Sequence, residues 1–142
     1  MADSPVSSSD DLATRIKFAA AWTSVMFMYA YADLLGFYDR RLIESILEGN
    51  MPVLGPITEE LRLGIAVLMS VPSLMIFVSI VAPKSVSRWA NVVTGVLFTL
   101  IIVWTLVMES PLYYKYFGLL EVTLTVYVVW AAFKWTGQTS GR

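Results

Sequence analysis

Four long apolar runs alternate with short polar segments along this 142-residue chain. The uncharged runs cover residues 18–32, 63–82, 89–108 and 122–133. At a rise of about 1.5 Å per residue, about 20 helical residues cross the roughly 30 Å hydrocarbon core of a bilayer. The pattern therefore predicts an all-α fold, a bundle of four transmembrane helices. The predicted spans are residues 16–38, 61–82, 88–108 and 112–134.

A short amphipathic segment follows the first predicted span. Asp39, Arg40 and Arg41 end the apolar run. Apolar residues then recur at helical spacing, opposite two glutamates: Leu42, Ile43, Ile46 and Leu47 against Glu44 and Glu48. This spacing predicts a short helix that lies at the membrane interface, between the first and second spans.

The rest of the chain predicts a single membrane domain with two polar tails. Residues 1–11 are rich in serine and aspartate, and we expect them to be a disordered N-terminal tail. Ser9 is a typical N-cap, so a helix is predicted to start near Leu12. Thr58, followed by Glu59 and Glu60, predicts the start of the second span. The membrane domain covers residues 12–136, and residues 137–142 form the C-terminal tail.

The first span also has features of a secretory signal peptide. Arg15 and Lys17 precede an apolar run that ends in Ala30, Tyr31 and Ala32, a small-residue pattern typical of a cleavage site. The preceding segment is acidic, and the run holds bulky aromatic residues such as Trp22. These features favour a retained transmembrane helix over a cleaved leader.

Composition supports the membrane interpretation and removes several kinds of chemistry. Hydrophobic residues make up 57% of the chain and charged residues 15%, whereas soluble domains have about 45–50% and about 25%. The net charge of −1, with no basic cluster, gives no reason to expect a nucleic-acid partner. Because histidine and cysteine are both absent, we expect no cofactor, no metal site and no thiol chemistry.

Basic residues near the span ends predict the orientation in the membrane. One side would carry Arg15, Lys17, Lys84, Arg88, Lys134 and Arg142, and the other Arg40, Arg41, Arg62 and Lys115. Because basic residues favour the cytoplasmic side, we expect a multi-pass protein of the cell (inner) membrane with both termini in the cytoplasm.

Two acidic residues inside the apolar segments are the strongest candidates for a site. An acid within a spanning helix costs about 2.5–3.5 kcal/mol on insertion scales, so it seldom lies there without a reason. Asp33 lies close to the outer end of the first span, and Glu121 lies in the fourth span toward the same side. With Tyr29 as a possible hydrogen-bond donor, they predict an outward-facing pocket that binds a cation, a proton or a polar headgroup.

A purely structural interpretation competes with that pocket. Arg62 begins the second span on the same side and could form an ion pair with Asp33 or Glu121, which would only lock the bundle. In the third span, Arg88 and Asn91 are candidates for binding a lipid headgroup, although the polar stripe there is more typical of helix contacts.

Two short segments resemble a known family. Residues 69–79 (MSVPSLMIFVS) and 88–91 (RWAN) resemble a bacterial and archaeal family of small four-helix integral membrane proteins of unknown function. Trp22, Met26, Tyr29, Asp33 and Glu121 also look like its pattern. The resemblance implies a four-helix bundle and no known activity. The architecture is more weakly similar to that of DoxX-like membrane proteins.

These observations favour a non-enzymatic membrane module, such as an accessory, scaffold, lipid-binding or partner-binding subunit. Its expected partners are the lipid bilayer, further copies of itself or another membrane protein. The alternative is an oligomeric transport element in which Asp33 and Glu121 carry protons or cations, because four helices alone enclose little volume. An enzyme that uses the two acids as acid and base is the third possibility.

Overall fold

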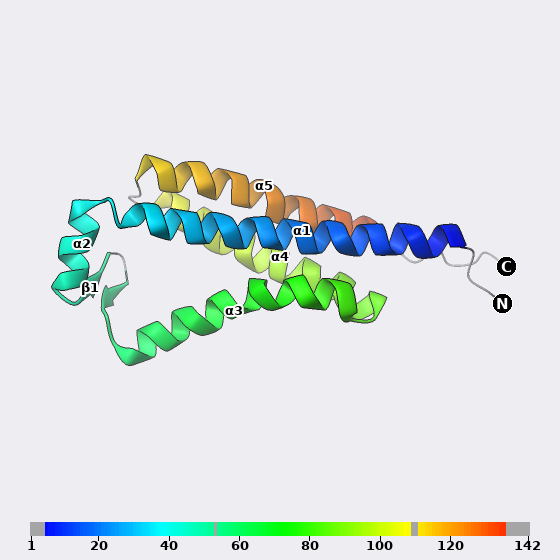
Figure 1. Ribbon diagram of the computed structural model, residues 1–142, viewed down its shortest axis with the longest axis horizontal. Coiled ribbons are helices and arrows are strands. Elements are labelled where there is room, and N and C mark those ends of the chain that lie inside the picture. Colours follow the sequence, from blue (N-terminus) through cyan, green and yellow to red (C-terminus); the bar gives the residue numbers. More distant parts are fainter. Residues whose placement is uncertain (1–4, 53, 109–110, 136–142) are drawn as a thin grey trace.

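The computed structural model describes residues 5–52, 54–108 and 111–135 (Figure 1). Its elements in order are α1 (Pro5–Gly36), α2 (Arg40–Leu47), β1 (Asn50–Met51), β2 (Gly55–Pro56), α3 (Glu59–Val81), α4 (Lys84–Val107) and α5 (Leu112–Lys134). The helices α1, α3, α4 and α5 are long and apolar enough to cross a membrane. This confirms the predicted four-helix membrane bundle, with the short helix α2 between the first two spans.

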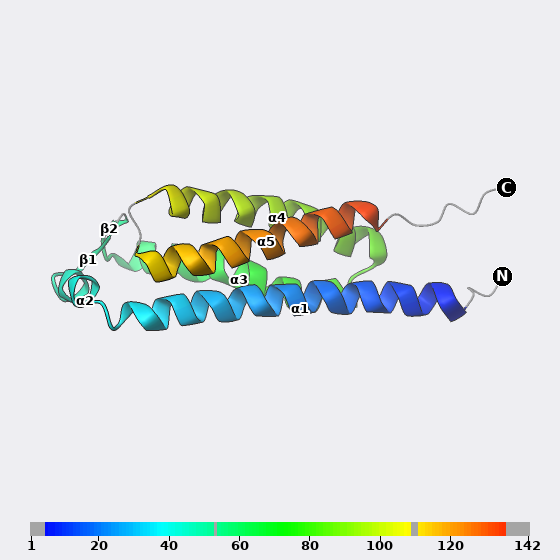
Figure 2. The same ribbon diagram turned by 90° about the horizontal axis from the view of Figure 1, so that it is seen from above.

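The four long helices lie roughly along one axis, and α1 packs against both α3 and α5 (Figures 1 and 2). Helices α4 and α5 form the closest pair, and α3 also contacts α4. Helix α2 and the antiparallel hairpin β1–β2 lie at one end of the bundle, which we call the α2 end. The turn between α3 and α4, together with the start of α1 and the last turn of α5, lies at the opposite end, which we call the turn end.

The starts of the helices differ in part from the predictions. α1 begins at Pro5 rather than near Leu12, so Ser9 lies inside the helix instead of capping it. The Asp11 carboxylate helps to hold these first turns, because it pairs with Arg15 at 2.9 Å and with Lys84 of α4 at 3.0 Å. The predicted cap of α3 is confirmed, since Thr58 Oγ1 accepts a hydrogen bond from Leu61 N at 3.2 Å. Residues 1–4 and 136–142 lie outside the described part of the chain.

The buried core fills the half of the bundle near the turn end. Phe18, Trp22, Phe98 and Val128, from α1, α4 and α5, are almost completely enclosed there. Gly95 allows α4 and α5 to approach closely, because a Cβ atom at this position would lie 2.6 Å from Val129 Cγ2. Aromatic edge contacts, such as that of Trp22 with Phe98, join the helices further.

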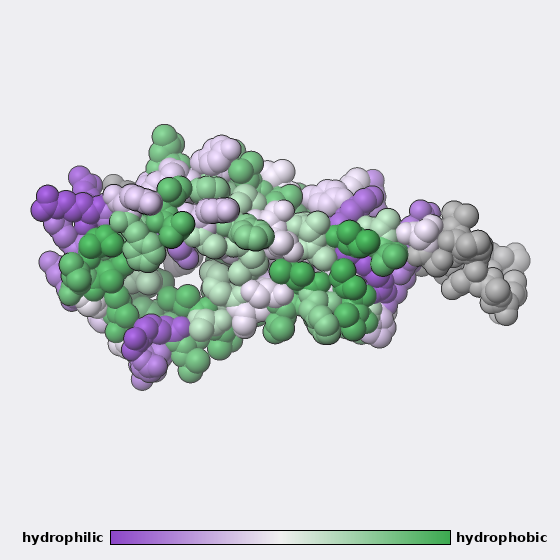
Figure 3. All heavy atoms as spheres, in the orientation of Figure 1, coloured by the Kyte–Doolittle hydropathy of each residue, from purple (hydrophilic) through white to green (hydrophobic). Residues whose placement is uncertain are grey.

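Helix α3 packs tightly with only one of its halves. Its buried residues, Pro72, Met75 and Ser79, all lie in the second half, toward the turn end. Pro72 lies in the middle of the helix, and proline interrupts the helical hydrogen-bond ladder and favours a bend. Toward the α2 end α3 moves away from α1, and the surface between them is hollowed (Figures 1 and 3).

Candidate functional site

Glu121 is the buried acid of the bundle. It lies nine residues into α5, about 13 Å along the helix from its first residue, and only 4% of its surface is exposed. Its neighbours on the same face, Gly118 and Thr125, are also buried, so this face of α5 is turned toward the other helices. Glu121 therefore faces the interior of the bundle.

The Glu121 carboxylate nevertheless has no partner among the residues that the structure describes. No hydrogen bond or ion pair to it occurs among the described residues. Within the same part of the chain, Asp11 Oδ1 is the one buried side-chain oxygen without a hydrogen bond, and the ammonium group of Lys84 lies 3.0 Å from it. In the described part of the chain, the Glu121 oxygens have no hydrogen bond, yet neither is a fully buried atom without a partner. It follows that the small exposed surface of Glu121 includes its carboxylate, which faces accessible space.

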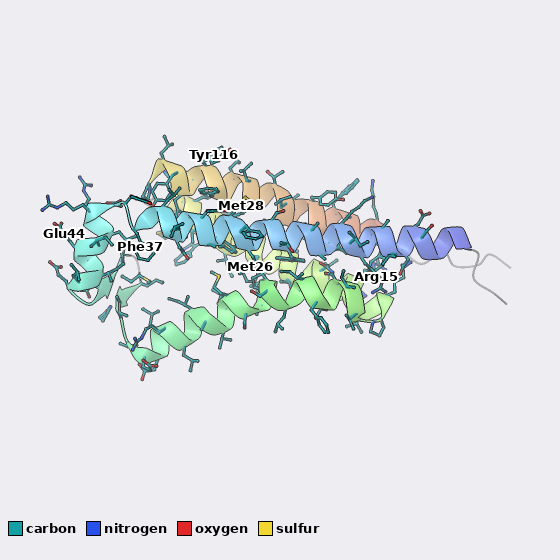
Figure 4. All side chains as sticks on the ribbon, viewed as in Figure 1. Arg15, Met26, Met28, Phe37, Glu44 and Tyr116 are labelled. Carbon is teal, nitrogen blue, oxygen red and sulfur yellow. The ribbon has the colours of Figure 1, made fainter. Side chains whose placement is uncertain are left out.

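Asp33 lies on the inner face of α1 but is exposed. It follows the fully buried Trp22 by eleven residues, about three helical turns, so the two side chains share one face. Met26, seven residues before Asp33 on that face, points toward α3, and Ser73 Oγ donates to its Sδ at 3.6 Å (Figure 4). Asp33 therefore lies on the side of α1 that faces α3, and it is exposed because α3 diverges from α1 toward the α2 end (Figure 1).

Two tyrosines accompany the two acids. Asp33 and Glu121 both lie toward the α2 end, on the helices α1 and α5, which pack against each other. Tyr29, one turn before Asp33 on the same face of α1, is half-buried. Tyr114, two turns before Glu121 on the same face of α5, is also half-buried. We call these four residues the acid crevice.

Arg62 does not reach the acid crevice. Its guanidinium pairs with Glu59, three residues earlier on α3, and both side chains are exposed. The predicted ion pair of Arg62 with Asp33 or Glu121 is therefore wrong. The reason is the direction of α3, whose first half leaves the bundle and carries Arg62 away from α1 and α5.

The wall of the hollow that faces the acids is apolar. The buried face of α3 at Pro72 continues toward the α2 end through residues four, seven and eleven positions earlier, which share that face. These are Leu68, Ile65 and Leu61, and all three are only partly buried. By helical spacing, the face of α1 that contacts α3 at Met26 also carries Tyr29 and Asp33, and the facing side of α3 carries aliphatic side chains.

Asn91 and Arg88 take part in helix contacts near the turn end. Asn91 is fully buried; its Oδ1 accepts from Trp22 Nε1 at 2.8 Å, and its Nδ2 donates to Ser87 O at 2.8 Å and to Ser79 Oγ at 3.1 Å. Its amide has no surface left for a lipid headgroup. Arg88 donates to Ala132 O at 3.1 Å at the end of α5 and is only partly buried, so it stays a candidate for headgroup binding.

Sequence reasoning missed two features of the bundle. From the sequence, Arg15 is expected only to lie at the membrane surface. In the structure its guanidinium donates to Ser79 O, Ile80 O and Ala82 O at the end of α3, at 2.7 to 3.4 Å. No sequence signal marks that contact, because its acceptors are backbone carbonyls more than 60 residues away. Tyr114 is the second feature: its spacing of seven residues from Glu121 places it on the same face of α5, and it is half-buried.

The arrangement of charged groups limits the chemistry of the site. Among the described residues, no group of three metal-ligating side chains that could hold an ion is found. The acid crevice offers two carboxylates and two phenols without a basic partner, an arrangement that suits a proton or a cationic group.

Comparison with known proteins adds a family but no activity. A family model described as "Family of unknown function (DUF6326)" matches residues 11–141. This agrees with the predicted resemblance to a family of unknown function with four membrane helices. The comparisons with curated proteins and with solved structures each found no match, and a likeness to DoxX-like proteins is not shown.

Proposed function

This chain belongs to the DUF6326 family of unknown function, and we propose that it is a non-enzymatic membrane module that binds a proton or a cationic ligand in the acid crevice. The observation that carries the proposal is the state of Glu121, which is 4% exposed and has no hydrogen bond or ion pair among the described residues. A buried carboxylate without a partner is costly, so a bundle that keeps one gains something other than stability from it.

The shape of the bundle supports binding from one side over transport through a single copy. The half near the turn end is closed by the packed side chains of Phe18, Trp22 and Phe98 and by the Asn91 hydrogen bonds. The half near the α2 end contains Asp33, near the end of α1, and Glu121, in the first half of α5, and its surface is hollowed between α1 and α3 (Figure 3). A transport role would need a second opening, which an assembly of several copies would have to supply.

An apolar carbodiimide tests the proposal directly. Dicyclohexylcarbodiimide partitions into bilayers and reacts with protonated carboxyl groups that it can reach. We expect it to modify Glu121 in phosphatidylcholine liposomes, with the modified peptide identified by mass spectrometry across acidic to mildly alkaline pH. Glu59, which is exposed and paired with Arg62, serves as the internal control and should react much less.

Absence of any Glu121 adduct at every pH, in a protein shown to be folded by circular dichroism, would overturn the proposal. The variant Glu121→Gln should lose the adduct at this position and leave the remaining pattern unchanged. An adduct at Glu59 with none at Glu121 would show that the crevice carboxylate is sealed and that its role is structural.

A further inference from the structure

Resting on the proposed function, we infer that the ligand of the acid crevice is an amphiphile with an ammonium headgroup and an alkyl tail, which enters from the membrane between α1 and the first half of α3. The inference depends on how polar, apolar and charged groups are distributed around the hollow. It also depends on where the hollow opens.

The headgroup is determined by the charges at the α1 and α5 wall. Asp33 is exposed on the face of α1 that contacts α3 through Met26, and Glu121 is buried on α5. The nearest candidate cation of α3, Arg62, is paired with Glu59. An anionic headgroup would meet two acidic side chains, which repel it when they are ionised, with Arg62 already paired with Glu59. A cationic headgroup gains from both acids, and the rings of Tyr29 and Tyr114 can add cation–π attraction.

The tail is determined by the wall on α3. Leu61, Ile65 and Leu68 continue the inward face of that helix and are only partly buried, because α1 and α4 do not cover them fully. A small water-soluble cation would leave this apolar surface uncovered. An alkyl chain lying along these side chains would match their apolar surface, as the lipid tails do along the outer faces of the bundle.

The entry route follows from the position of the opening. α2 and the hairpin β1–β2 lie across the α2 end between α1 and α3, so that end is at least partly covered (Figure 1). The hollow opens on the side of the bundle, between α1 and α3 (Figure 3). The side of a membrane bundle faces lipid, and a molecule dissolved in the bilayer can reach Glu121 through it.

Protection of Glu121 from dicyclohexylcarbodiimide tests the ligand class in phosphatidylcholine liposomes. Dodecyltrimethylammonium, which cannot form an amide with the activated acid, is compared with dodecanol and with tetramethylammonium. At ten times its dissociation constant a ligand leaves about one site in eleven free, so dodecyltrimethylammonium should slow the modification about tenfold. Neither dodecanol, which lacks the charge, nor tetramethylammonium, which lacks the tail, should slow it more than about twofold at the same concentration.

A pair of tryptophan substitutions on α3 tests the entry route. Ile65→Trp places a large ring on the face that borders the hollow, and it should reduce the protection by dodecyltrimethylammonium at least about fivefold. Leu63→Trp is the matched control. Leu63 is 64% exposed, and because it lies two residues before Ile65 it points to the opposite face of the helix. It should leave the protection unchanged.

The outcomes separate this inference from the proposed function. If Glu121 is modified but none of the three compounds slows its modification, the amphiphile is excluded while the proposed binding of a proton stands. Equal protection by tetramethylammonium would show a small cation entering from water. Equal effects of Ile65→Trp and Leu63→Trp would overturn the route between α1 and α3.

Discussion

The indole of Trp22 in α1 donates a 2.8 Å hydrogen bond to Asn91 Oδ1 in α4, and both side chains are fully buried. Ser79 Oγ of α3 also donates to this oxygen, at 3.3 Å. One carboxamide therefore holds three of the four long helices together, in the half of the bundle where α3 packs closely.

Removing this carboxamide is expected to destabilise the bundle. In Asn91→Leu the Trp22 N–H and the Ser79 hydroxyl lose a buried partner, and a buried polar group left unpaired costs about 1–3 kcal/mol. Interhelical hydrogen bonds in membranes often contribute less, about 0.6 kcal/mol on average, so we expect a loss of about 1–2 kcal/mol in the free energy of unfolding. Equilibrium unfolding in mixed micelles measures this loss.

A double-mutant cycle with Trp22→Phe tests whether the two side chains act as a pair. The double variant should lose less stability than the sum of the single losses, since the broken bond is counted twice in that sum. Ser24→Ala, combined with Asn91→Leu, is the control, because the exposed Ser24 hydroxyl donates to Ala20 O of its own helix and to no other described residue. A full additive loss would contradict the pairing.

The sequence predicted the spans and the inward position of Glu121 but not the exposure of Asp33. Apolar runs of about 20 residues predict the spans. The spacing of Gly118, Glu121 and Thr125 along α5 places them on one face of the helix. The exposure of Asp33 depends on how far α3 bends away at Pro72, which no periodicity along α1 can indicate. The same divergence of α3 explains why the predicted ion pair with Arg62 is wrong. Arg62 lies at a similar depth in the membrane to the two acids, but the first half of α3 carries it away from them, and it pairs with Glu59.

Arg62 is expected to contribute little to stability. Its partner is Glu59 of the same helix, both are exposed, and exposed ion pairs contribute about 0–1 kcal/mol. Arg62→Leu should therefore change the free energy of unfolding by less than about 1 kcal/mol. Its effects should add to those of Asp33→Asn and Glu121→Gln in the double variants, because the residues share no contact. A coupling of more than about 1 kcal/mol with either acid would contradict this arrangement.

The orientation in the membrane can be tested with reporter fusions. The start of α1 and the end of α5 lie at the turn end, while Asn50 lies at the α2 end (Figure 1). We predict that fusions after Asn50 report the outer side and fusions at Arg142 the cytoplasmic side, because the basic residues are more numerous near the turn end. Fusions that report the same side would contradict the four-span topology, and a reversed result would contradict only its orientation.

Replacing Glu121 with an apolar residue should stabilise the protein while removing its reactivity. The carboxylate is buried without a hydrogen bond or ion pair in the described part of the chain, and an acid in a spanning helix costs up to about 3 kcal/mol on insertion scales. Glu121→Leu is therefore expected to raise the free energy of unfolding, by up to about that amount, and Glu121→Gln to raise it less because the amide remains polar. Unfolding in mixed micelles and carbodiimide labelling are measured on the same samples.

A group kept for structure would behave in the opposite way, since its removal would lower stability. Loss of more than about 1 kcal/mol in both variants would mean that Glu121 has a stabilising partner and is not a free binding group.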